Sequence, residues 1–166
     1  FIGIGDFAVI KDQWKDIVVD YYVEHEYAEY AKDIFGDTPE MIQFFSDILQ
    51  YEYPWNKYSQ MVARDYVSGA MENTTAVLHQ ERAQQKPGQL IDENIWEGTI
   101  AHELIHHWFG NLVTTESWTN LAVNEAFANY SEYLWNEYKY GKNKAEEDRY
   151  FDLKRYTSDE SHFEKD

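Results

Sequence analysis

Residues 101–110 read AHELIHHWFG, a stretch that combines apolar side chains with three histidines and a glutamate. His102 and His106 are four residues apart, so on an α-helix their side chains leave one face a single turn apart. That spacing lets two imidazole nitrogens reach one zinc ion at about 2.0–2.1 Å each. Glu103 stands beside the first histidine, where its carboxylate can act as a general base on a metal-activated water. The pattern is H-E-x-x-H, and it predicts a metal-binding helix.

The apolar residues of the same stretch indicate that this helix is largely buried. They are Ala101, Leu104, Ile105, Trp108 and Phe109. Histidines and a glutamate in a buried helix carry a desolvation cost unless something binds them, and a metal ion removes that difficulty. Two imidazoles are too few for a catalytic zinc, which usually has three protein ligands and one open position.

A third ligand is available in the next helical segment, where Glu125 follows His106 by nineteen residues. Apolar residues flank Glu125, and a carboxylate on an apolar face needs a partner such as zinc. Glu132 lies two helical turns further on and shares the face of Glu125. It could accept a hydrogen bond from the outer nitrogen of a zinc-bound histidine, or it could be a surface carboxylate, and the spacing does not decide between the two.

These motifs resemble a known family. H-E-x-x-H with a glutamate nineteen residues on is similar to the gluzincin pattern, and AHELIHHWFGNLVTTESWTNLAVNEAFANY resembles the zinc aminopeptidases that include aminopeptidase N and leukotriene hydrolase. The second signature of that family, GAMEN, is present at residues 69–73. The resemblance extends from about Tyr58 to Tyr140.

The resemblance implies an α+β, thermolysin-like catalytic domain, with a small N-terminal sheet whose edge strand borders the active site and metal-binding helices after it. It implies one zinc ion per chain on His102, His106 and Glu125, with Glu103 as the general base. It also implies peptide substrates with a free N-terminus, whose α-amine binds Glu72. The GAMEN residues that would contact the substrate are Gly69, Ala70, Met71, Glu72 and Asn73. Without the resemblance, SGAMEN is typical of a β-turn.

Residue patterns predict one domain over 1–166, with residues 1–91 mainly strands plus two helices and residues 92–166 zinc-binding helices. The expected strands cover 2–10, 17–23, 58–67 and 74–80. The expected helices cover 26–35, a segment that begins with Thr38 as N-cap, a segment from Asp92 or Glu93 to Gly110, and 119–140, followed by a helical start to the final segment.

Composition limits the partners. The chain has 14 basic and 31 acidic residues and a net charge of −17, which argues against nucleic acid and anionic membranes and is compatible with a cationic ligand such as a peptide amine. It has no cysteine, so disulfides and thiolate metal sites are excluded. No apolar run approaches the roughly 20 residues that span a bilayer, and no N-terminal stretch resembles a signal peptide. We expect a soluble chain and leave its compartment open.

Both ends of the sequence resemble cuts in a larger protein, since it starts at Phe1 and ends in a charged segment at Asp166. The family's catalytic tyrosine would fall beyond Asp166, so we expect a fragment that binds zinc with impaired turnover, and the remainder of the parent chain as a partner. Two other interpretations are a thermolysin-like endopeptidase and a non-catalytic, zinc-containing peptide-binding module.

The remaining histidines are weaker candidates. His107 is rotated by about 100° from His106 around the helix, so we expect it at the surface or behind the metal ligands. His25, His79 and His162 have no partners at metal-ligand spacing and are expected to be structural or solvated.

Overall fold

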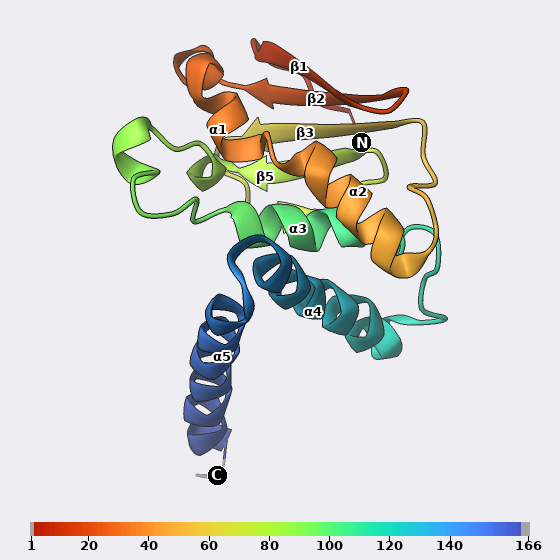
Figure 1. Cartoon of the computed structure of the whole chain (residues 1–166), viewed down its shortest axis with the longest axis vertical. Helices are drawn as coiled ribbons and strands as arrows, with labels where there is room; N and C mark the ends of the chain where they lie inside the picture. The colour runs from red at the N-terminus through yellow and green to blue at the C-terminus, as the bar shows by residue number, and fades with distance from the viewer. Residues whose placement is uncertain (1, 164–166) are drawn as a thin grey trace.

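The computed structural model describes residues 2–163, and it combines a mixed sheet with five α-helices in that part of the chain (Figure 1). The α+β class expected from the sequence is therefore confirmed at that level. The five strands are β1 (Ala8–Trp14), β2 (Ile17–Val23), β3 (Lys57–Ala63), β4 (Ala70–Met71) and β5 (Ala76–Gln80).

The strand order in the sheet is β1-β2-β3-β5-β4. The inner pairs β2–β3 and β3–β5 are parallel, whereas β1–β2 and β4–β5 are antiparallel hairpin pairs. β4 is consequently an edge strand, and it is formed by the second and third residues of GAMEN. The β-turn that SGAMEN suggests without the family resemblance does not form, because the turn lies later, where the N–H of Ala76 donates to the carbonyl of Asn73.

The first strand begins at Ala8, so the predicted strand over residues 2–10 is displaced toward the N-terminus. Gly3, Gly5 and Asp6 explain the difference, because glycine and aspartate disfavour the strand conformation. The second predicted strand, 17–23, coincides with β2.

Five α-helices and four short 3-10 segments complete the described chain. The helices are α1 (Ala31–Phe35), α2 (Thr38–Leu49), α3 (Glu97–Ile105), α4 (Leu121–Tyr140) and α5 (Lys142–Phe163). The 3-10 segments are His25–Tyr30, Glu81–Ala83, Pro87–Gln89 and Trp118–Asn120.

Several predicted helix boundaries need correction. Thr38 is the first residue of α2 and not its N-cap, and its hydroxyl donates to the carbonyl of Phe35. The helix expected over 26–35 is a 3-10 segment followed by the short α1. α3 starts only at Glu97, where the side chain of Asn94 accepts the N–H of Trp96, and it ends at Ile105, before the turn that leads to Gly110.

In Figure 1, α1 and α2 lie across the strands, and α3, α4 and α5 follow one another below them. α1 and α2 contact the sheet, α3 lies beside α2 and β4, α4 packs on α3, and α5 packs on α4 and points away from the sheet. The apolar side of α2 contributes Met41, Ile42 and Phe45 to the core, whereas Ile48 near its end is 45% exposed. Within residues 2–163, no helix is long and apolar enough to cross a membrane.

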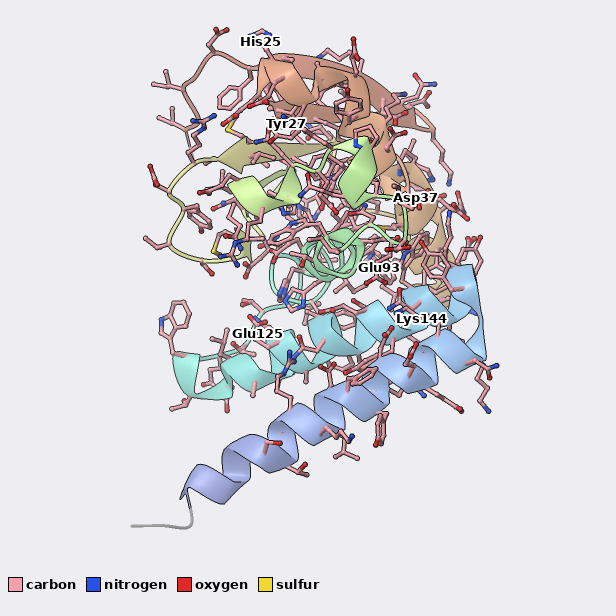
Figure 2. The ribbon with its side chains drawn as sticks, turned by 90° about the vertical axis from the view of Figure 1, so that its left-hand side faces the viewer. His25, Tyr27, Asp37, Glu93, Glu125 and Lys144 are labelled. Carbon is pink, nitrogen blue, oxygen red and sulfur yellow. The ribbon has the colours of Figure 1, made fainter. Side chains whose placement is uncertain are left out.

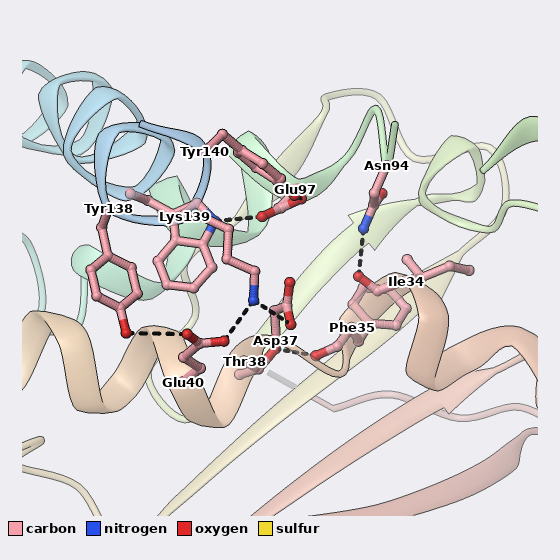
Figure 3. A network of polar contacts seen from close by, with 11 residues as sticks. Ile34, Phe35, Asp37, Thr38, Glu40, Asn94, Glu97, Tyr138, Lys139 and Tyr140 are labelled. Atoms are coloured by element: carbon pink, nitrogen blue, oxygen red, sulfur yellow. Dashed lines mark hydrogen bonds and ion pairs between the residues drawn. The ribbon is translucent and has the colours of Figure 1, made fainter. Parts of the chain in front are cut away.

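Polar contacts join the end of α4 to the starts of α2 and α3 (Figure 3). Lys139 Nζ lies 3.1 Å from Asp37 and 2.6 Å from Glu40, and both carboxylates belong to the entry of α2. The buried carboxylate of Glu97, in the first turn of α3, accepts hydrogen bonds from Trp135 Nε1 and from the Tyr140 hydroxyl. These contacts fix α4 relative to α3, which is the relation on which the candidate site depends.

His79 is a buried structural histidine on β5, as expected, and it predicts how stability depends on pH. Trp96 Nε1 donates to its Nδ1 and its Nε2 faces Gln60 Oε1, so the ring is neutral with its proton on Nε2. Burial lowers its pKa to about 3. In the unfolded chain, this imidazole has the ordinary histidine pKa of about 6.5 and binds a proton below that pH, whereas in the folded protein it stays neutral down to about pH 3. The free energy of unfolding therefore falls as the pH drops from about 6.5 to 3, by up to about 1.4 kcal/mol per pH unit.

We expect His79→Gln to remove this contribution, so that the free energy of unfolding of the variant depends less steeply on pH below about 6.5. Denaturant unfolding of both proteins at several pH values between 3.5 and 7 measures the difference. Equal slopes in the two proteins would contradict the assignment.

Candidate metal centre

Three side chains from two helices converge on one point between α3 and α4. His102 lies in α3, His106 follows its last residue, and Glu125 projects from α4 on the side that faces α3 (Figure 2). Glu125 Oε2 lies 3.3 Å from His102 Nε2 and 3.7 Å from His106 Nε2. One ligand atom from each of the three residues lies within 4.8 Å of the other two, so the group could hold a metal ion.

The outer nitrogens of both imidazoles are occupied. His102 Nδ1 donates to Glu132 Oε1 over 2.8 Å, and His106 Nδ1 donates to the carbonyl of Phe109 over 3.0 Å. Because a carboxylate and a carbonyl only accept hydrogen bonds, the Nδ1 atoms carry the protons and leave both Nε2 lone pairs for the convergence point.

Gly110 makes room for the second of these contacts. Its φ is +137°, a conformation that other residues rarely adopt, and a Cβ atom there would lie 3.2 Å from His106 Nδ1. Gly98 plays a comparable part for the first contact, since a Cβ on it would lie 3.1 Å from Glu132 Oε2.

The centre is strongly acidic. Burial lowers the pKa of His102, but the hydrogen bond that it donates to Glu132 and the charges of Glu132, Glu103 and Glu125 outweigh this effect, so the pKa is raised overall. The carboxylates therefore favour positive charge at this point, and a metal cation satisfies that preference as a proton does.

Glu103 is buried beside the three candidate ligands, and within residues 2–163 its Oε2 has no hydrogen-bond partner. Burial raises its pKa to about 8; His102 opposes this shift, and Glu72, Glu125 and Glu132 add to it. A buried carboxyl oxygen without a hydrogen-bond partner, surrounded by other carboxylates, is typical of a site that binds a cation and a hydrogen-bonding ligand. The donor set and this unpartnered oxygen both fit a bound metal ion with a water molecule.

The convergence point opens into a cavity of about 500 Å³, which lies between the edge strand and the two helices. Edge-strand residues form one wall and α4 with the segment before it forms the other. The lining residues include Gly69, Ala70, Met71, Glu72, Thr99, Trp118, Leu121 and Asn129. A Cβ atom on Gly69 would have no atom within 4 Å, so packing within the described chain does not require glycine there.

Most of the predicted site residues meet in this cavity. It is lined by four GAMEN residues, by the three candidate ligands, by Glu103 and by Glu132. Asn73 lies outside it, in a neighbouring depression that also includes Glu72.

One expectation about the site is wrong, and the expectation for His107 is narrowed to one of its two alternatives. The apolar neighbours of Glu125 on α4 do not bury it, because Ala122, Val123, Ala126 and Phe127 are exposed and the carboxylate faces α3 instead. For His107, the structure excludes the surface and agrees with the other expected place, behind the metal ligands: the ring is fully buried, packs on Tyr53 and Tyr58, and lies next to the backbone of Glu103.

The remaining histidines are placed as follows. His25 is exposed and contacts Asp6, and it lies far from Glu125, near the opposite end of the molecule (Figure 2). The side chain of His162 lies outside the described residues.

One contact at the site had no signal in the residue patterns. Asn111 Nδ2 donates to the carbonyl of Glu72 over 2.8 Å and so joins the end of the metal-binding segment to the edge strand. Asn111 lies inside the stretch that resembles the aminopeptidases, but nothing in its spacing indicates a partner 39 residues away.

Comparisons with known proteins agree with the geometry. The family model described as "Peptidase family M1 domain" matches residues 34–165. Aminopeptidase N of Canis lupus familiaris is 41% identical over 104 residues, which are 61% of this chain and 11% of that protein. Aminopeptidase N of Streptomyces lividans is 35% identical over 75% of this chain and 15% of its own length.

Aminopeptidase M1 of Arabidopsis thaliana is 33% identical over 137 residues, or 80% of this chain and 16% of that protein. The chain thus spans between about a tenth and a sixth of the length of these relatives.

Proposed function

The chain belongs to peptidase family M1, and from this premise we propose that it carries the catalytic centre of a zinc-dependent aminopeptidase, which releases N-terminal residues from peptides. The observation that carries the proposal is the shared cavity, which is lined by the three candidate metal ligands, by the buried Glu103 and by Glu72, the residue after the edge strand.

Zinc is the metal that we assign to His102, His106 and Glu125, one ion per chain. Two imidazole nitrogens and one carboxylate oxygen are a common catalytic zinc set, which leaves one position open. When bound, zinc polarises the scissile carbonyl and makes water more acidic. Glu132 would hold the His102 ring through its Nδ1, a contact that orients the ring and increases its basicity.

Glu103 is assigned as the general base. It is adjacent to His102, lines the cavity and is not one of the three converging ligands. Its carboxylate would take a proton from the attacking water and deliver it to the leaving amine.

The edge strand is assigned to the substrate. Glu72 would bind the α-ammonium group, and the acidic surroundings favour that charge. Gly69, Ala70 and Met71 would contact the peptide along the free edge of β4, and the open space over Gly69 allows a ligand backbone to approach. Asn73 would support this segment from its turn.

The two rival functions each meet an opposing observation. An endopeptidase needs room for chain on both sides of the scissile bond, whereas Glu72 places a carboxylate in the cavity. A non-catalytic module has no need for a buried glutamate whose oxygen lacks a partner beside the metal ligands.

Substrates with and without a free amine test the proposal. We expect the protein to cleave an aminoacyl peptide at least about 10–100-fold more efficiently than the N-acetylated peptide, because a charge-assisted hydrogen bond contributes about 1.5–3 kcal/mol. The values of kcat/KM for the two peptides provide the measurement, and Glu72→Gln should reduce the ratio. Equal cleavage of both peptides would favour an endopeptidase. Peptide binding by the full-length protein without any cleavage would favour the non-catalytic module.

A further inference from the structure

The hairpin that carries Glu72 is anchored by two side chains from the segment after α3. Asn111 Nδ2 donates to the carbonyl of Glu72 over 2.8 Å. His107 Nε2 accepts the backbone N–H of Thr75 over 2.9 Å. These two contacts join the amine-binding strand to the segment that holds His106.

Strand pairing alone gives this hairpin little support. β4 contains only two residues and pairs with β5 alone, through Ala70 with His79 and Met71 with Leu78. Glu72 already lies beyond the paired residues, so the sheet does not fix its backbone. Side-chain contacts from outside the sheet must do so.

Thr75, in the turn of the hairpin, is a conformational outlier. Its φ is +65°, in the left-handed region that a β-branched residue rarely adopts. Such a conformation persists where neighbouring contacts determine it. For Thr75 these contacts are His107, which accepts its N–H, and the N–H of Ser59, which donates to its carbonyl.

The His107 ring is itself rigidly oriented. Its Nδ1 donates to the carbonyl of Glu103 over 3.2 Å, so Nε2 is the acceptor that faces Thr75. The ring is completely buried, with the rings of Tyr53 and Tyr58 at centroid distances of 5.7 and 5.0 Å.

Asn111 is connected to the metal centre as directly as His107. Its backbone N–H donates to the carbonyl of His106 over 2.9 Å. The same residue therefore contacts a candidate zinc ligand through its main chain and the Glu72 backbone through its side chain.

We propose that His107 and Asn111 are positioning residues that set the distance between Glu72 and the metal centre. This inference rests on the proposed function. Since an aminopeptidase must place the substrate amine and the scissile carbonyl one residue apart, that distance determines which bond is cleaved. Neither residue contacts the substrate, and both act through the backbone of the hairpin.

Inhibitors that bind the metal test the position of Glu72 relative to the metal centre without any need for turnover. An α-amino acid hydroxamate and the same hydroxamate without its amine bind the metal through identical groups. The inhibition constant of the compound without the amine, divided by that of the amino compound, therefore reports the amine contact alone. We expect Asn111→Asp, which replaces the donor with a second acceptor facing the Glu72 carbonyl, to reduce this ratio about tenfold or more while zinc content is retained. Asn56→Asp is the matched control on an exposed asparagine and should leave the ratio unchanged.

His107 allows a rescue experiment. His107→Leu removes the acceptor for Thr75 N–H, so we expect the ratio to fall and the backbone amides of residues 69–75 to exchange hydrogen faster. His107→Gln retains an acceptor oxygen and should recover part of both effects. Should Asn111→Asp fail to fold, Asn111→Ala provides the same comparison without the added charge.

The outcomes separate the two proposals. An unchanged ratio in both Asn111→Asp and His107→Leu, with zinc bound, would overturn the positioning role and leave the aminopeptidase assignment intact. A ratio near one in the unmodified protein would overturn the aminopeptidase assignment and the positioning role with it.

Discussion

Replacing Glu103 with glutamine is expected to stop peptide cleavage while the metal remains bound. The three converging ligands are His102, His106 and Glu125, so the amide should not alter the first coordination sphere. Glutamine nearly matches glutamate in shape but cannot accept a proton from water. General base catalysis contributes typically 10²–10⁴-fold, so we expect kcat to fall by about that factor with KM little changed.

The measurement combines zinc per chain, obtained by elemental analysis, with kcat and KM on a free-amine peptide. Glu116→Gln is the matched control, because Glu116 is an exposed glutamate in the segment between α3 and α4. Wild-type turnover in Glu103→Gln would eliminate Glu103 as the base. Loss of zinc in that variant would instead indicate that Glu103 belongs to the ligand set.

The residues of this centre differ in how far the sequence could predict them. His102 and His106 follow from helical periodicity alone, because residues four apart share a face whatever the rest of the fold does. The prediction of Glu125 as the third ligand depends on the spacing of nineteen residues from His106 that the family resemblance supplies. The apolar residues beside Glu125 do not form a buried face around it, since Val123 and Phe127 are 53% and 47% exposed.

His107 shows why the remainder of the site could not be predicted from local patterns. Helix geometry places His107 about 100° from His106, but it leaves open what lies on that side of the helix. In the fold that side faces the sheet and the hairpin turn, so the residue is buried and hydrogen-bonded to Thr75. Contacts of this kind, like that of Asn111 with Glu72, join residues more than 30 positions apart and depend on the tertiary structure.

Some predicted strand boundaries differ from those of the structure for a related reason. β4 is only two residues long, and it exists because β5 offers a partner for Ala70 and Met71. No alternating pattern of that length can be recognised in a sequence. β2 has seven residues, all β-branched or aromatic except Asp20, and its predicted range agrees with the structure.

Replacing His106 with alanine is expected to remove the metal and, with it, all turnover. His106 is 1% exposed, its Nε2 lies 3.7 Å from Glu125 Oε2, and its Nδ1 is bound to the Phe109 carbonyl, so its substitution removes one of the three converging ligand atoms. The loss of an outer hydrogen-bond partner of a zinc ligand costs about 10–100-fold in affinity, and we expect the loss of a ligand to exceed that range. Zinc per chain after dialysis, and the zinc concentration needed to restore activity, provide the measurements.

His25→Ala is the matched control, because it deletes an exposed histidine at the other end of the molecule (Figure 2). It should retain one zinc per chain and wild-type cleavage, and chelator-treated wild-type protein should recover when zinc is added. Since a cavity in place of a buried imidazole can itself destabilise the fold, His102→Ala serves as the second variant: its ring is 17% exposed and it should lose zinc with less effect on thermal unfolding. If both variants retained zinc and cleaved peptides, the metal would have to bind elsewhere, and the H-E-x-x-H assignment would be wrong.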